Sequence, residues 1–292
     1  MPILQLRDHP AALASALVLL ALAGLALAAP LIESALGVDA SSLSLLERLA
    51  GPSLGHPLGT DELGRDVLAR LLEGGRVSLF VGVTAALTAA LLGTAIGLPA
   101  GYRGGRLDEF LMRLTDGVIA LPLLPLLVVL AAVSPEKLGL GGVDVELLGL
   151  LRIVALVALV GWTTAARLVR GATLATRRLD HVRSAEALGA GPVRIMLVHI
   201  LPNIAAPLVV ATTLSVGNVI LLESVLSFLG LGIQPPLPSW GNMLTNAQEM
   251  IWSAPMLAVW PGLLIFVTVI ACNLLGDGLQ DALDPRFNRH RR

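Results

Sequence analysis

The chain has 292 residues, of which 55% are hydrophobic and 14% are charged, whereas an average soluble domain has about 25% charged residues. Together with a mean hydropathy of +0.81, this composition excludes a disordered chain and indicates that lipid is the solvent for most of the protein. The formal net charge of -1 argues against a nucleic-acid partner, and a single cysteine, Cys272, excludes a disulfide framework and a cysteine-based metal cluster.

Six apolar stretches are long enough to cross about 30 Å of hydrocarbon as helices. Gly and Pro residues within them favour helices over the short alternating strands of a barrel. The sequence therefore predicts an all-α membrane protein with six transmembrane helices, in the stretches Ala11–Ile32, Val77–Tyr102, Leu114–Val133, Leu147–Leu168, Ile204–Leu231 and Met256–Leu275.

The first stretch has two interpretations. Arg7, an apolar run and the triplet Ala26-Leu27-Ala28 also fit a secretory signal with a cleavage site. The apolar run of about 20 residues exceeds the 7 to 15 residues usual for a signal core, which favours a membrane helix. Residues 1–32 are accordingly predicted to be a cytoplasmic N-terminus followed by the first transmembrane helix.

Lys and Arg accumulate in cytoplasmic loops, so their distribution predicts the orientation. With the N-terminus inside, 14 of the 20 basic residues fall in inner segments and six in outer ones. We therefore expect a multi-pass protein of the bacterial inner membrane with both termini in the cytoplasm. Residues 33–75 are then extracytoplasmic, residues 76–276 form a five-helix core, and residues 277–292 form a cytoplasmic tail.

The outer segment 33–75 contains an amphipathic pattern at Asp61–Leu72, where Thr60 is suited to cap a short helix. Such a helix lies either on the membrane surface or bundle, or against a partner protein. In the second stretch, Gly93, Gly97 and Gly101 recur every four residues, which allows another helix backbone to approach. Trp240, Trp252 and Trp260 are predicted to be anchors at the membrane interface.

The inner loop 167–203 is too polar for lipid and has a helical stripe in which Leu179, Val182, Ala185 and Leu188 recur every three residues. The sequence Gly189-Ala190-Gly191-Pro192 then predicts a sharp turn and a second helix that ends near Leu201. A short helix outside the membrane favours docking onto another protein, with a helix on the lipid surface as the alternative.

Few ionisable residues lie within the predicted spans. Intramembrane acids usually face a bundle interior or a water-filled path, which makes Asp116 and Glu223 candidates for a substrate path or gate. Arg113 is the expected neutralising partner of Asp116. Asn218 and Ser224 complete the candidate set, and a structural hydrogen bond between helices is the alternative role.

The sequence contains no phosphate-binding loop of the G-x-x-x-x-G-K-[ST] type, and its only lysine is Lys137. It also lacks the H-E-x-x-H and G-x-S-x-G patterns, and its five histidines have no metal-ligand spacing. We therefore predict no catalytic residue, no metal site and no cofactor in this chain.

Several motifs resemble a known family. The residues Ala187-Leu188-Gly189-Ala190, with His199-Ile200-Leu201-Pro202-Asn203, resemble the cytoplasmic "EAA" signature of bacterial ABC importer permeases. The stretches 56–66, 222–232, 239–241 and 276–285 are similar to the C-type permease of the dipeptide, oligopeptide and nickel group.

The resemblance implies a type I ABC importer permease fold, a second homologous permease subunit, two cytoplasmic ATPase subunits and an extracytoplasmic solute-binding protein. ATP and Mg²⁺ then belong to the ATPase subunits, and the cytoplasmic helix sits in a groove of an ATPase. Arg183 and Ser184 stand where the signature has Glu and Ala, so Glu186 is the acid left to pair with Arg183 or the ATPase. The implied coupling residues are Val182, Arg183, Ser184, Ala185, Glu186, Ala187, Leu188, Gly189 and Ala190.

The sequence leaves three functions open for this protein. The first is the permease half of an ATP-driven importer of di- and oligopeptides, with nickel, haem or glutathione as alternative substrates. The second is a secondary transporter acting alone, which predicts an internal repeat and more intramembrane charge than the sequence shows. The third is a signalling or scaffold protein that uses the inner loop as a dock.

Overall fold

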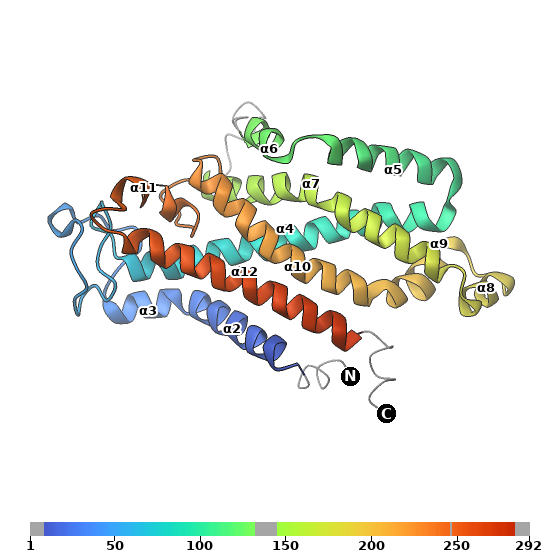
Figure 1. Cartoon of the computed structure of the whole chain (residues 1–292), viewed down its shortest axis with the longest axis horizontal. Coiled ribbons are helices and arrows are strands. Elements are labelled where there is room, and N and C mark those ends of the chain that lie inside the picture. The colour runs from blue at the N-terminus through green and yellow to red at the C-terminus, as the bar shows by residue number, and fades with distance from the viewer. Residues whose placement is uncertain (1–8, 132–144, 246, 284–292) are drawn as a thin grey trace.

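The computed structural model describes residues 9–131, 145–245 and 247–283. Within these residues the regular elements are helical, and the β-pairing is an isolated bridge between Thr60 and Asp66. The long helices run side by side along the longest axis (Figure 1). Helix α8 (Asp180–Ala187) lies at one end, and the segment between α3 (Ala29–Leu36) and α4 (Val67–Arg103) lies at the other.

Five described helical segments are long and apolar enough to cross a membrane. Lipid can surround them because every internal backbone group is paired within its own helix. The segments are α2 (Pro10–Leu27), α4, α7 (Val145–Thr176), the run Pro192–Phe228 that includes α9 (Pro192–Arg194) and α10 (Leu201–Phe228), and α12 (Met256–Leu283).

The expected third span, Leu114–Val133, is not one continuous helix. The structure divides it between α5 (Gly105–Ala120) and α6 (Leu123–Ala131), with Leu121 in an extended conformation. Pro122 explains the break, because a proline disfavours the helical conformation of the residue before it. The last residues of the expected span lie outside the described residues, so the prediction of six uninterrupted spans is not confirmed.

The predicted amphipathic helix at Asp61–Leu72 is wrong at its start. Helix α4 begins at Val67, where the Asp66 side chain accepts a hydrogen bond from the backbone N–H of Ala69 at 2.7 Å. Thr60 instead accepts a hydrogen bond from the backbone of Ala50 at 2.8 Å. The segment 67–72 is thus the first part of the long membrane helix, and the predicted boundary between residues 75 and 76 lies within that helix.

The glycine spacing on α4 is confirmed as a surface for close helix packing. A Cβ atom on Gly93 would lie 2.5 Å from Ala165 Cβ, and one on Gly101 would lie 2.8 Å from the carbonyl oxygen of Arg170. A Cβ atom on Gly97 would overlap the carbonyl oxygen of Ala166. The three glycines therefore allow the backbones of α4 and α7 to approach each other.

The main apolar core lies among α4, α7 and α10, with Val81, Ile153 and Leu226 fully buried in it. Helix α12 packs against α10 and α2, and Gly278 of α12 approaches Ala12 of α2. Helix α12 continues to Leu283, so the first part of the predicted tail 277–292 belongs to this helix. The first residue of α2, the last of α12 and α8 all lie toward the same end of the bundle (Figure 1).

Candidate coupling loop and membrane path

Helix α8 projects from the bundle and is anchored by one buried side chain. Val182 is fully buried in a cluster with Leu98, Ile195 and Ile200. The other members of the predicted stripe are less covered, since Leu179 is 48% and Leu188 is 88% exposed. Most of the predicted coupling set, including Arg183, Ser184, Glu186 and Ala187, is also exposed. The helix thus keeps one anchor and offers the rest of its surface to solvent or a partner.

The predicted glycine turn is confirmed. Gly189 has a φ of +81°, and the Ala190 N–H donates to the Ala185 carbonyl at 3.0 Å. The Gly189 N–H donates to the Glu186 carbonyl at 2.9 Å, which completes a Schellman motif at the end of α8. A left-handed residue favours glycine because a side chain there clashes with the backbone.

The helix after the turn begins at Pro192, as predicted, but does not end near Leu201. It passes through a π-helical segment, Ile195–Ile200, and continues as α10 to Phe228. Pro202 and Pro207 lie in this run without ending it. The coupling loop is therefore covalently continuous with a helix that runs the length of the bundle.

A basic notch of about 310 Å³ lies between the end of α7 and α8 and is lined by Leu174, Arg177, Arg178, Arg183 and Glu186. Glu186 accepts a hydrogen bond from the Tyr102 hydroxyl at 3.3 Å, and Arg177 lies over the Tyr102 ring at 5.5 Å. No described ion pair joins Glu186 to Arg183. The notch was not predicted, although the sequence places three arginines within seven residues here.

Asp116 does not pair with Arg113 as expected. Its carboxylate accepts a hydrogen bond from Arg167 of α7, and Arg113 pairs with Glu109 at 2.9 Å. The Asp116 side chain is 60% exposed, so it faces away from the interior of this subunit. Glu109 and Asp116 both lie about one helical turn from Arg113, but Asp116 is already paired with Arg167 of the neighbouring helix.

Glu223 is fully buried near the C-terminal end of α10. Its carboxylate accepts hydrogen bonds from the Ser78 hydroxyl of α4 at 3.1 Å and from the Ser227 hydroxyl at 2.7 Å. The same Ser78 oxygen accepts the backbone N–H of Trp240 at 3.2 Å, and Ser227 Oγ accepts that of Ile233 at 3.0 Å. Glu223 thus links two helices to the loop that follows α10.

The four path candidates do not converge on one site. Ser224 is buried and donates to the Ile220 carbonyl of its own helix at 2.8 Å. Asn218 lies on the exposed face of α10, while Asp116 lies on α5. Within the described residues, Glu223 and Ser224 share a buried region and the other two are separate from it.

Trp240 is a core residue, which corrects its prediction as an interface anchor. It is 2% exposed, and its indole N–H donates to the Leu71 carbonyl at 3.0 Å. A Cβ atom on Gly75 would lie 2.9 Å from its ring, so α4 is shaped around the indole. Trp252, by contrast, is 95% exposed. The sequence alone does not separate these two tryptophans.

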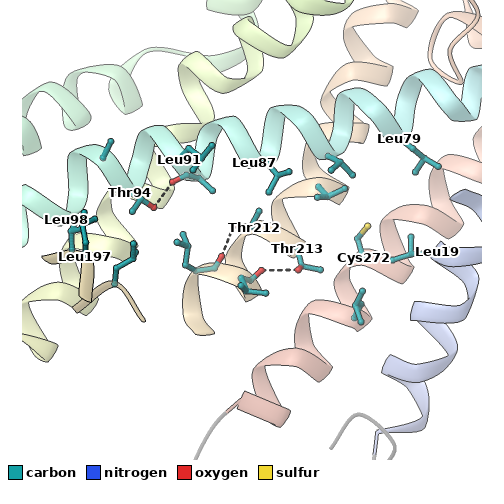
Figure 2. A pocket seen from close by; sticks show the side chains of 18 of the residues that line it. Leu19, Leu79, Leu87, Leu91, Thr94, Leu98, Leu197, Thr212, Thr213 and Cys272 are labelled. Carbon is teal, nitrogen blue, oxygen red and sulfur yellow. Dashed lines mark hydrogen bonds between the residues drawn. The ribbon is translucent and has the colours of Figure 1, made fainter. Parts of the chain in front are cut away.

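A larger groove of about 1130 Å³ lies between α2, α4, α10 and α12 (Figure 2). It is lined by leucines such as Leu19, Leu87 and Leu197, with Cys272 at one side. The hydroxyls of its three threonines, Thr94, Thr212 and Thr213, all donate to carbonyls of their own helices. The groove therefore offers a polar solute an apolar wall without a free hydroxyl donor.

Comparison with known proteins places this arrangement in a family. Residues 93–289 match the family described as "binding-protein-dependent transport system inner membrane component". The chain is 41% identical over 283 residues to the glutathione transport system permease protein of Pectobacterium atrosepticum. This match covers 97% of this chain and 89% of the relative.

Two further relatives match over nearly the whole chain. The oligopeptide transport system permease protein of Bacillus subtilis is 35% identical over 286 residues, covering 98% of this chain and 89% of the relative. The dipeptide transport system permease protein of Alkalihalophilus pseudofirmus is 36% identical over 283 residues, covering 97% and 88%. With its apolar helices and matched residues, the chain belongs to the family of binding-protein-dependent transport system inner membrane components.

Proposed function

We propose that the chain is a transmembrane permease subunit of an ATP-driven importer for di- and oligopeptides. It forms half of the translocation path with a second homologous permease subunit. Two ATPase subunits bind on the cytoplasmic side, and an extracytoplasmic solute-binding protein delivers the substrate. The dipeptide and oligopeptide permeases among its relatives support this substrate class.

The observation that carries the proposal is the form of the α8 region. An exposed short helix is held by Val182, turned by Gly189 and joined directly to the segment Pro192–Phe228. Motion of an ATPase bound to α8 would therefore reach the membrane helix through four residues of connecting chain. A helix resting on the lipid surface would need an apolar face, but exposed Arg183 and Glu186 flank the stripe.

The basic notch supports an acidic contact on the ATPase. Arg177, Arg178 and Arg183 line it against the single acid Glu186, which is already bonded to Tyr102. Opposite charge at such a surface favours association and fixes orientation. We propose that a carboxylate of the ATPase enters the notch, in place of a contact through the Glu that the family signature has at position 183.

The proposed topology has six crossings and both termini in the cytoplasm. The pair α5 and α6 supplies the third crossing, with its break at Leu121 and Pro122. Broken helices are tolerated at membrane depth where neighbouring protein covers the freed backbone groups. The end that bears α8 is then cytoplasmic, and the end that bears the loops around Thr60 and Trp240 is extracytoplasmic.

Glutathione is the second candidate substrate, because the 41% identical relative is a glutathione permease. It shares with peptides a backbone of amide bonds and free carboxylates. Nickel and haem have less support, since no group of three or more metal-ligating side chains occurs among the described residues. Selectivity between peptides and glutathione would rest largely on the binding protein.

The test is reconstitution of the complete complex, with its natural permease and ATPase partners, into liposomes. Labelled dipeptide, glutathione or nickel is supplied on the side of the membrane that holds the binding protein. Uptake is then measured with and without ATP on the side that holds the ATPase subunits. We expect ATP-dependent uptake of the dipeptide that disappears when the binding protein is omitted. Equal uptake by this chain alone, driven by an ion gradient, would establish the secondary-transporter alternative instead.

A further inference from the structure

A polar pocket of about 250 Å³ lies at the end of the bundle opposite α8. It is enclosed by the start of α4, the loop before it and the segments that follow α10. Its polar lining includes the charged side chains of Asp61, Glu62, Arg65 and Arg70. We call it the Arg70 pocket.

Arg70 is 5% exposed, and its backbone N–H donates to the Asp66 carbonyl, but among the described residues no hydrogen bond is made by its guanidinium. Its one ion pair joins Nε to Asp61 Oδ2 at 3.4 Å, which is long for a hydrogen bond. Its Nη1 atom is buried without a hydrogen-bond partner. Leaving the N–H donors of Nη1 unpaired in a buried position is costly.

The neighbouring acids are occupied by other donors. Asp61 accepts the backbone N–H groups of Leu63 and Arg65 and the Arg65 Nε–H, at 2.9, 2.9 and 2.7 Å. Glu62 pairs with Arg65 Nη2 at 3.3 Å. Local rearrangement would thus take an acceptor from one arginine to give it to the other. An acceptor for Arg70 Nη1 would therefore have to come from outside this set of described side chains.

We propose that the Arg70 pocket binds a carboxylate group that arrives from the extracytoplasmic side. A planar carboxylate matches the fork of a guanidinium and forms two parallel charge-assisted hydrogen bonds. A phosphate fits less well, because its greater negative charge would face the carboxylates of Asp61 and Glu62 that also line the pocket. The volume is several times the roughly 30 Å³ of a water molecule, enough for a carboxylate with its carbon stem.

This inference rests on the proposed function for its sidedness. Two sources can supply the carboxylate: the C-terminus of a peptide substrate on delivery, or an acidic side chain of the docked binding protein. Both present the same chemistry to Arg70. The experiment therefore measures carboxylate binding first and its source second.

The probe is N-acetylglycine, compared with N-acetylglycinamide, which has the same size and no charge. Thermal unfolding of the complete complex in nanodiscs is followed at rising probe concentrations without nucleotide. We expect N-acetylglycine to raise the unfolding temperature saturably and the amide to leave it unchanged. In Arg70→Met the apparent Kd should rise about tenfold or more, because a charge-assisted pair is lost. The matched control is Arg48→Met, an exposed arginine in the same segment.

Equal shifts by acid and amide in the natural protein, or an unchanged Kd in Arg70→Met, would overturn the proposal. If Arg70→Met does not assemble, Arg70→Lys takes its place. Lysine keeps the charge but lacks the bidentate fork, so weaker carboxylate binding is expected, and unchanged affinity contradicts the role of the guanidinium.

The second arm identifies the source. If the binding protein supplies the acid, N-acetylglycine lowers its affinity for the complex, and Arg70→Met does the same. If the peptide supplies it, docking is unaffected and a C-terminally amidated peptide is taken up more slowly. Because probe binding needs neither ATP nor uptake, failure of the proposed transport would leave the binding result standing, and the reverse also holds.

Discussion

At the scale of the residue, Gly189 gives the sharpest test of coupling. Its φ of +81° costs a β-branched residue about 1 to 2 kcal/mol or more, while a Cβ there meets no atom of this chain within 4 Å. Gly189→Val should leave membrane insertion intact, weaken ATPase co-purification and uncouple ATP hydrolysis from uptake, with Gly189→Ala milder. These three quantities are measured on the reconstituted complex.

Gly191 provides the control for this substitution. It is also exposed and open, but its φ of -70° suits any residue. Gly191→Val therefore adds the same bulk two residues away without the backbone cost. If Gly189→Val behaves like the natural protein in both ATPase binding and stimulated hydrolysis, α8 does not couple, and a helix on the lipid surface becomes the better interpretation.

Glu223 now calls for a different expectation from the one its sequence suggested. If Glu223 lined the substrate path, Glu223→Ala would lower uptake more than it lowers assembly. Since its carboxylate is buried and accepts hydrogen bonds from Ser78 and Ser227, we expect its loss to leave two buried O–H donors without an acceptor, at about 1 to 3 kcal/mol each. The amount of folded complex and the uptake should then fall together, as measured by thermal unfolding and transport per folded complex.

Ser224→Ala is the comparison for Glu223→Ala, because the Ser224 hydroxyl donates to the carbonyl of Ile220 in its own helix. We expect its stability to change by less than about 1 kcal/mol. Normal assembly of Glu223→Ala with lost transport would restore the path role.

At the scale of the element, His56 ties the outer segment to the start of α4. Its Nδ1 lies 2.9 Å from Asp66 Oδ2, and its Nε2 lies 3.4 Å from Glu47. The hydrogen bond to Asp66 is the main cause of a raised His56 pKa, above the ordinary 6.5. The stabilisation is thus complete below pH 6.5 and declines as the pH rises through the folded-state pKa.

Hydrogen exchange of residues 45–66 measures this dependence. We expect faster exchange at pH 8.5 than at pH 5.5 once the intrinsic pH dependence of exchange is removed. In His56→Gln the difference should vanish, while His181→Gln on exposed α8 should keep it. An equal difference in all three proteins would show that His56 is not the group responsible.

The α4–α7 contact predicts a packing defect at Gly97. In Gly97→Ala the new methyl group would overlap the Ala166 carbonyl, so the two helix backbones must separate. We expect a loss of about 1 to 3 kcal/mol, as for other overpacked cores, visible as a lower unfolding temperature. Gly171→Ala on α7 has open space around it and should be neutral or slightly stabilising; similar losses in both variants would contradict the packing argument.

The sequence was sufficient where a local signal decides the structure. Gly189 and Pro192 predict a turn and the start of a helix. The spacing of Gly93, Gly97 and Gly101 predicts a close contact between helices. Asp66 and Pro122 carried equally clear cap and break signals, but a longer apolar pattern obscured them. The environments of Glu223, Trp240 and Arg70 could not be predicted from the sequence. Ser78 lies 145 positions from Glu223, and Leu71 lies 169 positions from Trp240. The neighbours of Arg70 are other charged residues, whose pairing depends on exact geometry.

At the scale of the whole molecule, the orientation is open to direct test. Cys272 is replaced by Ala, and single cysteines are placed at Ser184 on α8 and at Ser253 in the exposed segment before α12. An impermeant maleimide is then applied to intact spheroplasts. We expect labelling of Ser253→Cys at once and of Ser184→Cys only after permeabilisation, since basic residues concentrate on the α8 side. The opposite pattern would invert the topology.

The continuous helical run Pro192–Phe228 can act as a lever that connects the two ends of the bundle. At about 1.5 Å per residue, its 37 residues extend about 55 Å, so a tilt of about 5° about one end would displace the other by about 5 Å. The displaced end carries Glu223 and Ser227, whose hydrogen bonds hold Ile233 and, through Ser78, Trp240. A small rotation imposed at the α8 elbow would thus strain the loop that follows α10, so that a force applied at one end of the bundle would be transmitted to the other.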